Sequence, residues 1–542
     1  MKRYLITILS ILVLLFGAMG ITACGGNGGG GGDEPTAYTG KLEFQLNFGG
    51  KDYSCVSIGD ETDKNIVIPE YYEGKKVTSI GENAFKGANI LSVVIPNSVE
   101  TINKSAFEGC DKLANVTLSS GLKSIGENAF WGCSSLTSIT LPSNVSSIGD
   151  KAFNGCNFLN NIMVEEGNSS YKSVDGNLFS KDGTKLIAYA SGKTQTSYEV
   201  PNGVTSLNNY ALYGALNLKS VAIPSSVKTI GNQTFAFSTS LESMTIPNGV
   251  TTIGEAAFYA CSGLKSVTLP TSVSTIKKQT FYNCVSLESV SIPNSVKSIE
   301  DYAFYYCKNL KNVDVPSSVI SVGNYAFSGC GFEEISLPST ITSMGEGAFA
   351  NCLSLKTIAI PTGVKTLEEN SFHGCVNLEN LTISNTVTKI SNYAFNKCYK
   401  LQSLKIPNSV RTIGQYAFAD CDTLTTITFD GVSKLEKIET FAFAFCDNLV
   451  NFTIPASVRY IGICAFVLNR SDGYATQGSL KSVTFEVTSG WTFTGTKRPI
   501  IEDGNDITTE FTQDIFTNRT LPSANQTASW LRGTYRNFTW TR

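Results

Sequence analysis

Histidine is nearly absent from this chain, because His373 is the one histidine among 542 residues. A Ser-His-Asp or Cys-His catalytic arrangement would have to use that residue. No phosphate-binding loop is present, since the glycine-rich stretch 25–32 does not follow a strand-like segment. Neighbouring acids such as Glu368 and Glu369 mean little in a chain with 45 acidic residues. We therefore predict that the protein is not an enzyme and has no catalytic residue and no cofactor.

Charge is scarce as well, with 16% charged residues and a formal net charge of −3. No basic patch is visible, which argues against nucleic acid as a partner. The 42% content of apolar residues excludes a disordered chain. The apolar run from Leu5 to Phe16 is too short to cross a bilayer comfortably.

The first residues have the form of an export leader. Lys2 and Arg3 precede the apolar run, and Ile-Thr-Ala-Cys at 21–24 resembles the bacterial lipobox, in which cleavage before the cysteine accompanies its lipidation. The alternative is an ordinary secretory peptide with a chance cysteine. We expect a lipoprotein signal peptide at 1–23 and a lipidated Cys24 with a Gly-rich tether at 24–37. This predicts an outer-membrane lipoprotein, attached through its lipid only, at the cell surface or on the periplasmic face.

The dominant feature is a short phrase, most often Ala-Phe-x-Gly-Cys, that occurs sixteen times. Most copies are 23 residues apart, two gaps are 22, one is 25, and one of 59 holds an insertion. A fixed period of this length indicates a solenoid, in which each copy is one coil. Leu212 marks one copy, and phenylalanine marks the others: Phe85, Phe107, Phe130, Phe153, Phe235, Phe258, Phe281, Phe304, Phe327, Phe349, Phe372, Phe395, Phe418, Phe443 and Phe466.

Each coil has two halves. In one copy Val290 and Ile292 alternate with Ser289 and Ser291, the period of two that is typical of a half-buried strand. A turn and a second apolar pair follow. The segment before the cysteine has no alternation, so we expect one short helical turn that places the marker phenylalanine in the core.

The extended phrase Leu-x-Ser-Val-x-Ile-Pro-x-x-Val-x-x-Ile-Gly-x-x-Ala-Phe-x-Gly-Cys resembles the BspA-like (treponemal-type) leucine-rich repeats of bacterial surface proteins, such as those of Bacteroidetes. The resemblance covers roughly residues 77–487. It implies a leucine-rich-repeat solenoid, mainly β with short helical turns, of about 16 coils of ~23 residues with parallel strands on one face. The domains expected are an N-terminal cap (38–76), the solenoid (77–488) with a hairpin insertion at about 165–198, and a C-terminal cap or small module (489–542).

The chain has fifteen cysteines, and twelve lie three residues after a marker phenylalanine. Equivalent side chains in stacked coils point the same way, which does not suit the twist of a disulfide. Ala88, Ala215 and Ser238 show that a small residue suffices at this position. We therefore predict buried free thiols that act as small apolar fillers. Metal binding is the alternative, but the spacing contains no Cys-x-x-Cys pair, and we expect no metal. The twelve are Cys110, Cys133, Cys156, Cys261, Cys284, Cys307, Cys330, Cys352, Cys375, Cys398, Cys421 and Cys446.

Two surface patterns are candidates for partner binding. On the strand face, outward polar residues either are simply tolerated by the strands or form a hydrogen-bonding platform for an extended partner. The strand-face candidates are Ser289, Ser291, Asn312, Asp314, Glu334 and Ser336, with Asp314 and Glu334 as the first charged contacts. On the turn side, Tyr259, Tyr282 and Tyr305 follow the marker phenylalanine in three consecutive coils, as neighbour-covering side chains or as a sugar platform.

Members of the resembling family act in adhesion, so the preferred hypothesis is a monomeric, exported, lipid-anchored protein that binds a protein partner of the host matrix or of another bacterium. The second hypothesis is a glycan-binding surface lipoprotein for carbohydrate capture. The third is a structural envelope component without a dedicated ligand. The sequence does not distinguish among the three.

Overall fold

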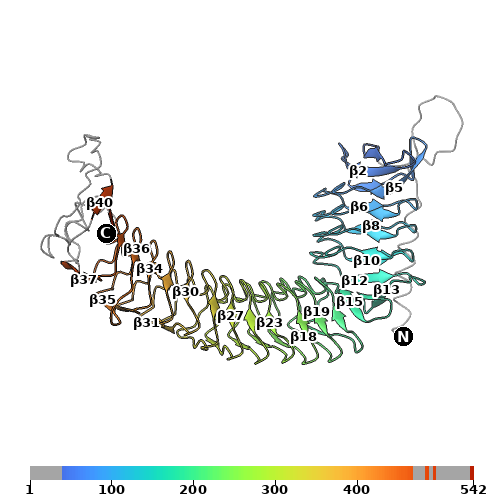
Figure 1. Cartoon of the computed structure of the whole chain (residues 1–542). Coiled ribbons are helices and arrows are strands. Elements are labelled where there is room, and N and C mark those ends of the chain that lie inside the picture. Colours follow the sequence, from blue (N-terminus) through green and yellow to red (C-terminus); the bar gives the residue numbers. More distant parts are fainter. Residues whose placement is uncertain (1–39, 468–481, 487–491, 496–537, 542) are drawn as a thin grey trace. The chain divides into compact units, whose positions relative to one another are not determined.

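The structure is a computed structural model that describes residues 40–467, 482–486, 492–495 and 538–541. The chain is a parallel β-solenoid of about 18 coils with ~23 residues each, and the described residues contain no helix. Successive coils lie beside one another in chain order (Figure 1). The predicted solenoid and its period are confirmed.

The coils exceed the sixteen copies of the phrase because two irregular segments also complete a coil. In a regular coil the backbone amide of the marker residue donates a hydrogen bond to a carbonyl oxygen in the next coil. That oxygen belongs to the residue just before the next marker. Ile58 N donates in this way to Ala84 O (3.2 Å), and Tyr189 N donates to Ala211 O (2.7 Å). Ile58 and Tyr189 thus occupy the marker position without the phrase around them.

The first strand of each coil carries the sequence alternation, and its neighbours belong to the adjacent coils. Where strands pair, they are parallel and in register, as in Ser266↔Ser289 and Val267↔Val290. We call this set the first ladder. Its strands are β3 (Asn65–Val67), β6 (Ser92–Val94), β8 (Asn115–Thr117), β10 (Ser138–Leu141), β12 (Asn161–Val164), β16 (Ser197–Glu199), β18 (Ser220–Ala222), β20 (Ser243–Thr245), β22 (Ser266–Thr268), β24 (Ser289–Ser291), β26 (Asn312–Val313), β29 (Thr357–Ala359), β31 (Asn380–Thr382), β33 (Ser403–Ile406), β35 (Thr426–Phe429), β37 (Asn451–Ile454) and β39 (Ser482–Phe485).

A second ladder follows the turn that contains the proline or its equivalent. Its strands are mostly two residues long, and where they pair with the next coil they do so in parallel, as in Ser298↔Ser321 and Ile299↔Val322. Most coils therefore contribute a strand to each of two parallel ladders. The strands are β5 (Lys75–Ile80), β7 (Thr101–Ile102), β9 (Ser124–Ile125), β11 (Ser147–Ile148), β17 (Ser206–Leu207), β19 (Thr229–Ile230), β21 (Thr252–Ile253), β23 (Thr275–Ile276), β25 (Ser298–Ile299), β27 (Ser321–Val322), β28 (Ser343–Met344), β30 (Thr366–Leu367), β32 (Lys389–Ile390), β34 (Thr412–Ile413), β36 (Lys437–Ile438) and β38 (Tyr460–Ile461).

The segment around the marker phenylalanine is a run of tight turns, so the expected short helical turn is wrong. Tyr302 and Tyr306, which flank Phe304, have positive φ angles of 57° and 61°. These left-handed residues break a helix and direct alternate amides toward the next coil. Phe304 N donates to Ala326 O at 2.8 Å, and Tyr306 N donates to Ser328 O at 2.7 Å. The backbone is thus satisfied between coils, as in the two ladders.

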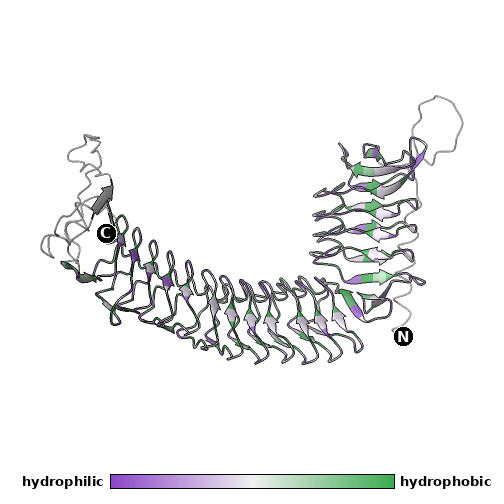
Figure 2. Ribbon diagram, in the orientation of Figure 1, coloured by the Kyte–Doolittle hydropathy of each residue, from purple (hydrophilic) through white to green (hydrophobic). Residues whose placement is uncertain are grey.

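The core contains stacked phenylalanine rings, in a column that is interrupted between Phe153 and Phe235. The centroids of neighbouring marker rings are 5.0 Å apart in the closest pair, Phe85–Phe107, and 6.0 Å apart in the widest pair, Phe130–Phe153. The inward residues of both ladders surround this column, and Figure 2 shows the hydrophobic strand segments beside more hydrophilic turns. A single coil cannot bury these side chains without its neighbours, which explains why the array folds as a unit.

Irregular strands occur at the ends and in the insertion. At the N-terminal end are β1 (Glu43–Leu46), β2 (Tyr53–Ser57) and β4 (Tyr71–Tyr72). The insertion forms β13 (Tyr171–Val174), β14 (Asn177–Ser180) and β15 (Lys185–Ala188), and β15 joins the second ladder beside β17. Near the C-terminus β40 (Thr492–Gly495) and β41 (Phe538–Thr541) are antiparallel. The predicted signal peptide, the tether and most of the predicted C-terminal module lie outside the described residues.

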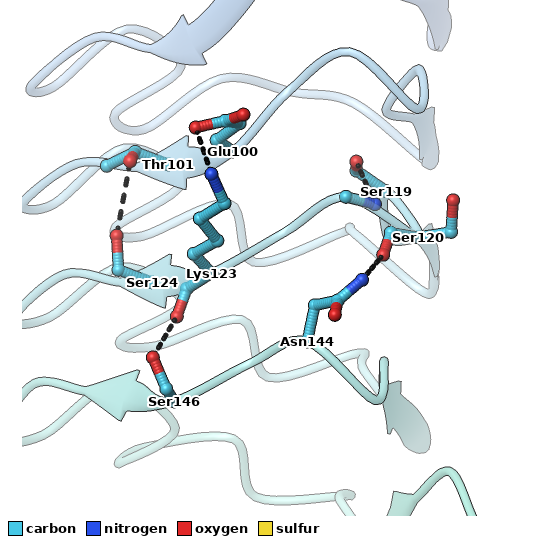
Figure 3. Close-up of polar contacts among 9 residues, drawn as sticks. Glu100, Thr101, Ser119, Ser120, Lys123, Ser124, Asn144 and Ser146 are labelled. Atoms are coloured by element: carbon cyan, nitrogen blue, oxygen red, sulfur yellow. Dashed lines mark hydrogen bonds and ion pairs between the residues drawn. The ribbon is translucent and has the colours of Figure 1, made fainter. Parts of the chain in front are cut away.

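Polar rungs tie neighbouring coils together at the surface. Lys123 Nζ lies 2.7 Å from a carboxylate oxygen of Glu100, and Ser124 Oγ donates to Thr101 Oγ1 at 3.2 Å (Figure 3). Such exposed pairs contribute at most about 1 kcal/mol each. Among the described residues, no helix is long and apolar enough to pass through a membrane.

Candidate binding surface

The strand-face candidates occupy outward positions along the first ladder. Ser289 and Ser291 are exposed on β24, and Val290 between them is buried. Asn312 begins β26, and Asp314, Glu334 and Ser336 are exposed in that coil and the next. The structure therefore places all six candidates on one continuous face.

The first ladder is interrupted where these candidates meet. Ser289 and Val290 pair with Asn312 and Val313, but the next coil has no first-ladder strand. Its segment 334–337 makes one isolated bridge, from Glu334 to Thr357. Within the described part of the chain, no backbone hydrogen bond joins 311–315 to 333–337. Each of the other described coils keeps its first-ladder strand, although some neighbouring strands are also unpaired.

The coil at the interruption is shortened and carries an unusual core residue. The Phe327–Phe349 coil has 22 residues, and Phe332 stands where other coils carry leucine. Phe332 is fully buried and meets Phe327 and Phe349 edge-on, with both centroid distances at 6.1 Å. Gly331 is pressed against the preceding coil, because a Cβ there would lie 1.9 Å from Lys308 O.

A second 22-residue coil shows that shortening alone does not break the ladder. The Phe85–Phe107 coil lacks the same residue, has Ile90 at the position of Phe332, and keeps β6 paired on both sides. The larger ring of Phe332 distinguishes this coil from the Phe85–Phe107 coil, although strands such as β8 and β10 are also unpaired in coils that carry leucine at this position. The second ladder stays closed at this point, with Ser321↔Ser343 and Val322↔Met344.

The interruption produces a groove of two connected hollows, which we call the interruption groove. Their volumes are about 670 and 740 Å³, and both are lined by Asn312, Glu334 and Thr357. The first hollow lies at the N-terminal end of the two strand segments, beside Lys311 and Glu333. The second lies toward their C-terminal end, beside Ser317 and Pro338. The groove therefore runs along the strand direction.

Charge is unevenly distributed in the groove. In the first hollow Lys356 Nζ lies 2.7 Å from a carboxylate oxygen of Glu333, and this hydrogen bond lowers the pKa of Glu333. Among the described residues, the second hollow is lined by Asp314 and Glu334 and by no cation. Neither of these two carboxylates has an ion-pair partner within 4.0 Å among the described residues.

A column of alternating charges borders the same face. It occupies the position just before the first-ladder strand in eight successive coils, and its members are Lys219, Glu242, Lys265, Glu288, Lys311, Glu333, Lys356 and Glu379. Each cation neighbours an anion in the next coil, so the column is neutral as a whole. Alignment of the copies in the sequence shows this column, which the search for single motifs missed. Asp314 and Glu334 stand outside it and remain unbalanced.

The predicted tyrosine stripe exists and is longer than expected. Tyr259, Tyr282 and Tyr305 stack face to face, with centroid distances of 4.7 and 4.8 Å. Phe237 continues the stripe beside Tyr259, with centroids 5.4 Å apart. Because Tyr282 is covered by a ring on each face, it offers an outside ligand its edge and hydroxyl group. Burial is the main cause of its raised pKa.

The cysteine column is free of disulfides, as predicted: every described cysteine is a free, buried thiol. No group of residues in the described part of the chain could hold a metal ion. Burial raises the pKa of Cys110 and of Cys156 to about 12, which keeps these thiols protonated and unreactive.

These thiols are more than apolar fillers, because each donates to the marker carbonyl of the preceding coil. Cys307 Sγ lies 3.1 Å from Phe281 O, and the other eleven make the equivalent contact. Ser238 Oγ donates to Leu212 O in the same way, at 2.9 Å. Ala88 and Ala215, whose side chains cannot donate, lie in the coils that directly follow the two irregular coils of Ile58 and Tyr189. From Cys110 to Cys446, the copies that follow a regular coil therefore carry a hydrogen-bond donor at this position, either cysteine or serine.

His373 is half-buried on the turn side, and its Nδ1 has no hydrogen-bond partner among the described residues. Its pKa is lowered, first by burial and then by Lys397. No metal-ligand group forms around it within the described residues.

Fold, period and exposed strand face together define a leucine-rich-repeat solenoid. The model of the BspA type leucine rich repeat region matches residues 78–192, 187–311, 274–402 and 365–487. The chain therefore belongs to the BspA-type leucine-rich-repeat family. Curated proteins give no match.

Several solved bacterial structures are similar. A leucine-rich repeat protein from Eubacterium ventriosum is 23% identical with a TM-score of 0.47, over 58% of this chain and 93% of that chain. A leucine rich cell surface protein from Faecalibacterium prausnitzii is 26% identical with a TM-score of 0.41, over 74% of this chain and 96% of that chain. A leucine-rich repeat protein from Bacteroides ovatus is 24% identical with a TM-score of 0.36, over 79% of this chain and 90% of that chain.

Proposed function

We propose that this protein is an exported, lipid-anchored adhesion protein that binds a protein of the host matrix or of another bacterium on its first-ladder face. The observation that carries the proposal is the interruption groove, where the repeat departs from its own pattern and exposes Asp314 and Glu334. A scaffold of this family supports a binding role. Anchoring rests on the lipobox-like residues before Cys24.

Different residues hold the solenoid together and bind the partner. The marker phenylalanines and cysteines are buried and serve the stack, so substitutions there act on stability. Ser289, Ser291, Asn312, Asp314 and Glu334 are exposed and contribute little to the core. Their substitution should change binding and leave the fold intact, which makes the two classes separable by experiment.

Binding of the full chain to immobilised matrix proteins, beside a glycan array, tests the proposal. The variant Asp314→Asn/Glu334→Gln should lose most protein binding, whereas Glu199→Gln, an exposed acid on the outward side of β16, should bind normally. Binding to glycans alone would favour the second hypothesis, carbohydrate capture. No binding on either array would favour a structural envelope component.

Location is tested separately, by treating intact cells with a protease. Digestion of the protein is expected if it is displayed at the cell surface. Substitution of Cys24 by alanine should release the protein from the membrane fraction if lipid is the anchor. A protein that survives protease on intact cells would contradict external adhesion and external capture together.

A further inference from the structure

We propose that the interruption groove binds an extended, basic polypeptide segment and seats one arginine or lysine side chain between Asp314 and Glu334. This rests on the proposed binding function and specifies the chemistry of the partner. Three features carry it: the open backbone of the interrupted ladder, the direction of the groove, and the unbalanced charge of the second hollow.

The open backbone provides pairing positions for a partner. Strand β24 pairs with β22 on one side and β26 on the other, whereas some other neighbours, such as β8 and β10, are unpaired. At the groove, 311–315 and 333–337 face each other without a backbone hydrogen bond among the described residues. An extended peptide that adds to such an edge gains main-chain hydrogen bonds irrespective of its sequence.

The groove has the direction and length that such a peptide needs. Its lining follows the chain from Lys311 to Ser317 on one side and from Glu333 to Pro338 on the other. A strand advances about 3.3 Å per residue, so a segment of about six residues occupies roughly 20 Å of groove. Alternate side chains of the bound peptide point to the same face, and those that face the protein enter the two hollows.

The second hollow suits a long cationic side chain. Its apolar floor is formed by Val313, Val315, Ile335 and Leu337, and its charged lining residues are Asp314 and Glu334. Arginine and lysine combine an aliphatic stem with a charged head, so the stem covers the floor while the head meets the carboxylates. Arginine also binds carboxylates in a bidentate manner, which favours it over lysine.

The surrounding charges leave Asp314 and Glu334 as a pair of uncompensated acids in this part of the strand face. Glu333 is neutralised by Lys356, and the alternating column balances itself from coil to coil. An acidic or purely apolar partner would leave Asp314 and Glu334 uncompensated.

The probe is a set of fluorescent ten-residue peptide pools with a fixed central residue (Arg, Lys, Gln or Glu) and degenerate Thr, Val, Ser and Ile flanks. Anisotropy of each pool is measured against the full chain at low and at high salt. The arginine pool should bind at least about tenfold more tightly than the glutamine pool, and the glutamate pool should bind most weakly. High salt should reduce the difference.

Two variants and one control test the parts of the proposal. Asp314→Asn/Glu334→Gln should reduce the preference for arginine to less than about threefold, while Glu199→Gln should keep it in full. Phe332→Ile imitates Ile90 of the other 22-residue coil and leaves both acids in place. It should close the ladder and weaken every pool alike. Circular dichroism confirms that each variant is folded.

The proposal is overturned if arginine and glutamine pools bind wild type equally, if no pool binds, or if the preference for arginine survives in Asp314→Asn/Glu334→Gln. Unchanged binding by Phe332→Ile overturns the main-chain pairing. Matrix-protein binding that persists without a basic preference would refute this inference and leave the proposed function standing. Loss of both would refute the two together.

Discussion

Removal of one ring from the phenylalanine column is the sharpest test of the fold. Phe304 is fully buried, and its centroid lies 5.3 Å from those of Phe281 and Phe327. Truncation of a buried phenylalanine to alanine costs about 3–5 kcal/mol, which includes the lost stacking and the cavity. Phe304→Leu should cost less than about 2 kcal/mol, because Leu212 already fills this position in one coil.

Urea unfolding followed by circular dichroism measures the total effect, and hydrogen exchange locates it. In a solenoid each coil contacts its neighbours, so loss of the ring should act locally. The amides of Phe281 and Phe304, which donate to the next coil at 2.8 Å, should lose protection. The equivalent amide of Phe107 should keep its protection. A total cost below about 1 kcal/mol, or equal loss of protection at Phe107, would refute the role given to the column.

Four further outcomes are expected. Cys307→Ala should cost about 1–2 kcal/mol in urea unfolding and Cys307→Ser less, because serine keeps a donor for the preceding marker carbonyl; equal costs would contradict the donor role. Gly132→Ala should cost about 1–2 kcal/mol because φ is +74°, and Gly132→Asn less, since asparagine tolerates this conformation. Thiols other than Cys24 should resist iodoacetamide at pH 8 in the native protein and react in denaturant. Because the pKa of His373 is lowered from 6.5 in the folded state, the unfolded state binds the extra proton, so stability should fall between pH 7.5 and 5.5. In His373→Tyr the free energy of unfolding should fall less over this pH range, and a pH profile identical to that of the wild type would contradict the prediction.

The solenoid could be predicted because every coil repeats the same spacing of apolar residues. Val290 and Ile292 alternate with serines, and Phe304 recurs at one period, so the inward set follows from spacing alone. The helical turn was mispredicted because the absence of alternation does not distinguish a helix from a run of turns. Left-handed residues at Tyr302 and Tyr306 decide between them, and their amides find partners in the next coil.

The candidate site was predicted only in part. Asp314 and Glu334 stand out in the sequence as charges in a row of hydroxyl groups. Their common groove lies in the coil where Phe332 packs between Phe327 and Phe349, and side-chain packing in a crowded core is not a sequence pattern. The 22-residue spacing was visible, but the same spacing at Ile90 leaves the ladder paired.

The sequence by itself determined the period, the coil as the repeating unit, the buried marker residues and the free state of the cysteines. These follow from local spacing, which each copy specifies for itself. Contacts between coils decided the rest: the second ladder, the thiol-to-carbonyl bonds, the covered faces of the tyrosines and the interruption groove. Each of these depends on residues about one period apart, where shape and hydrogen-bond geometry, rather than residue type, set the outcome.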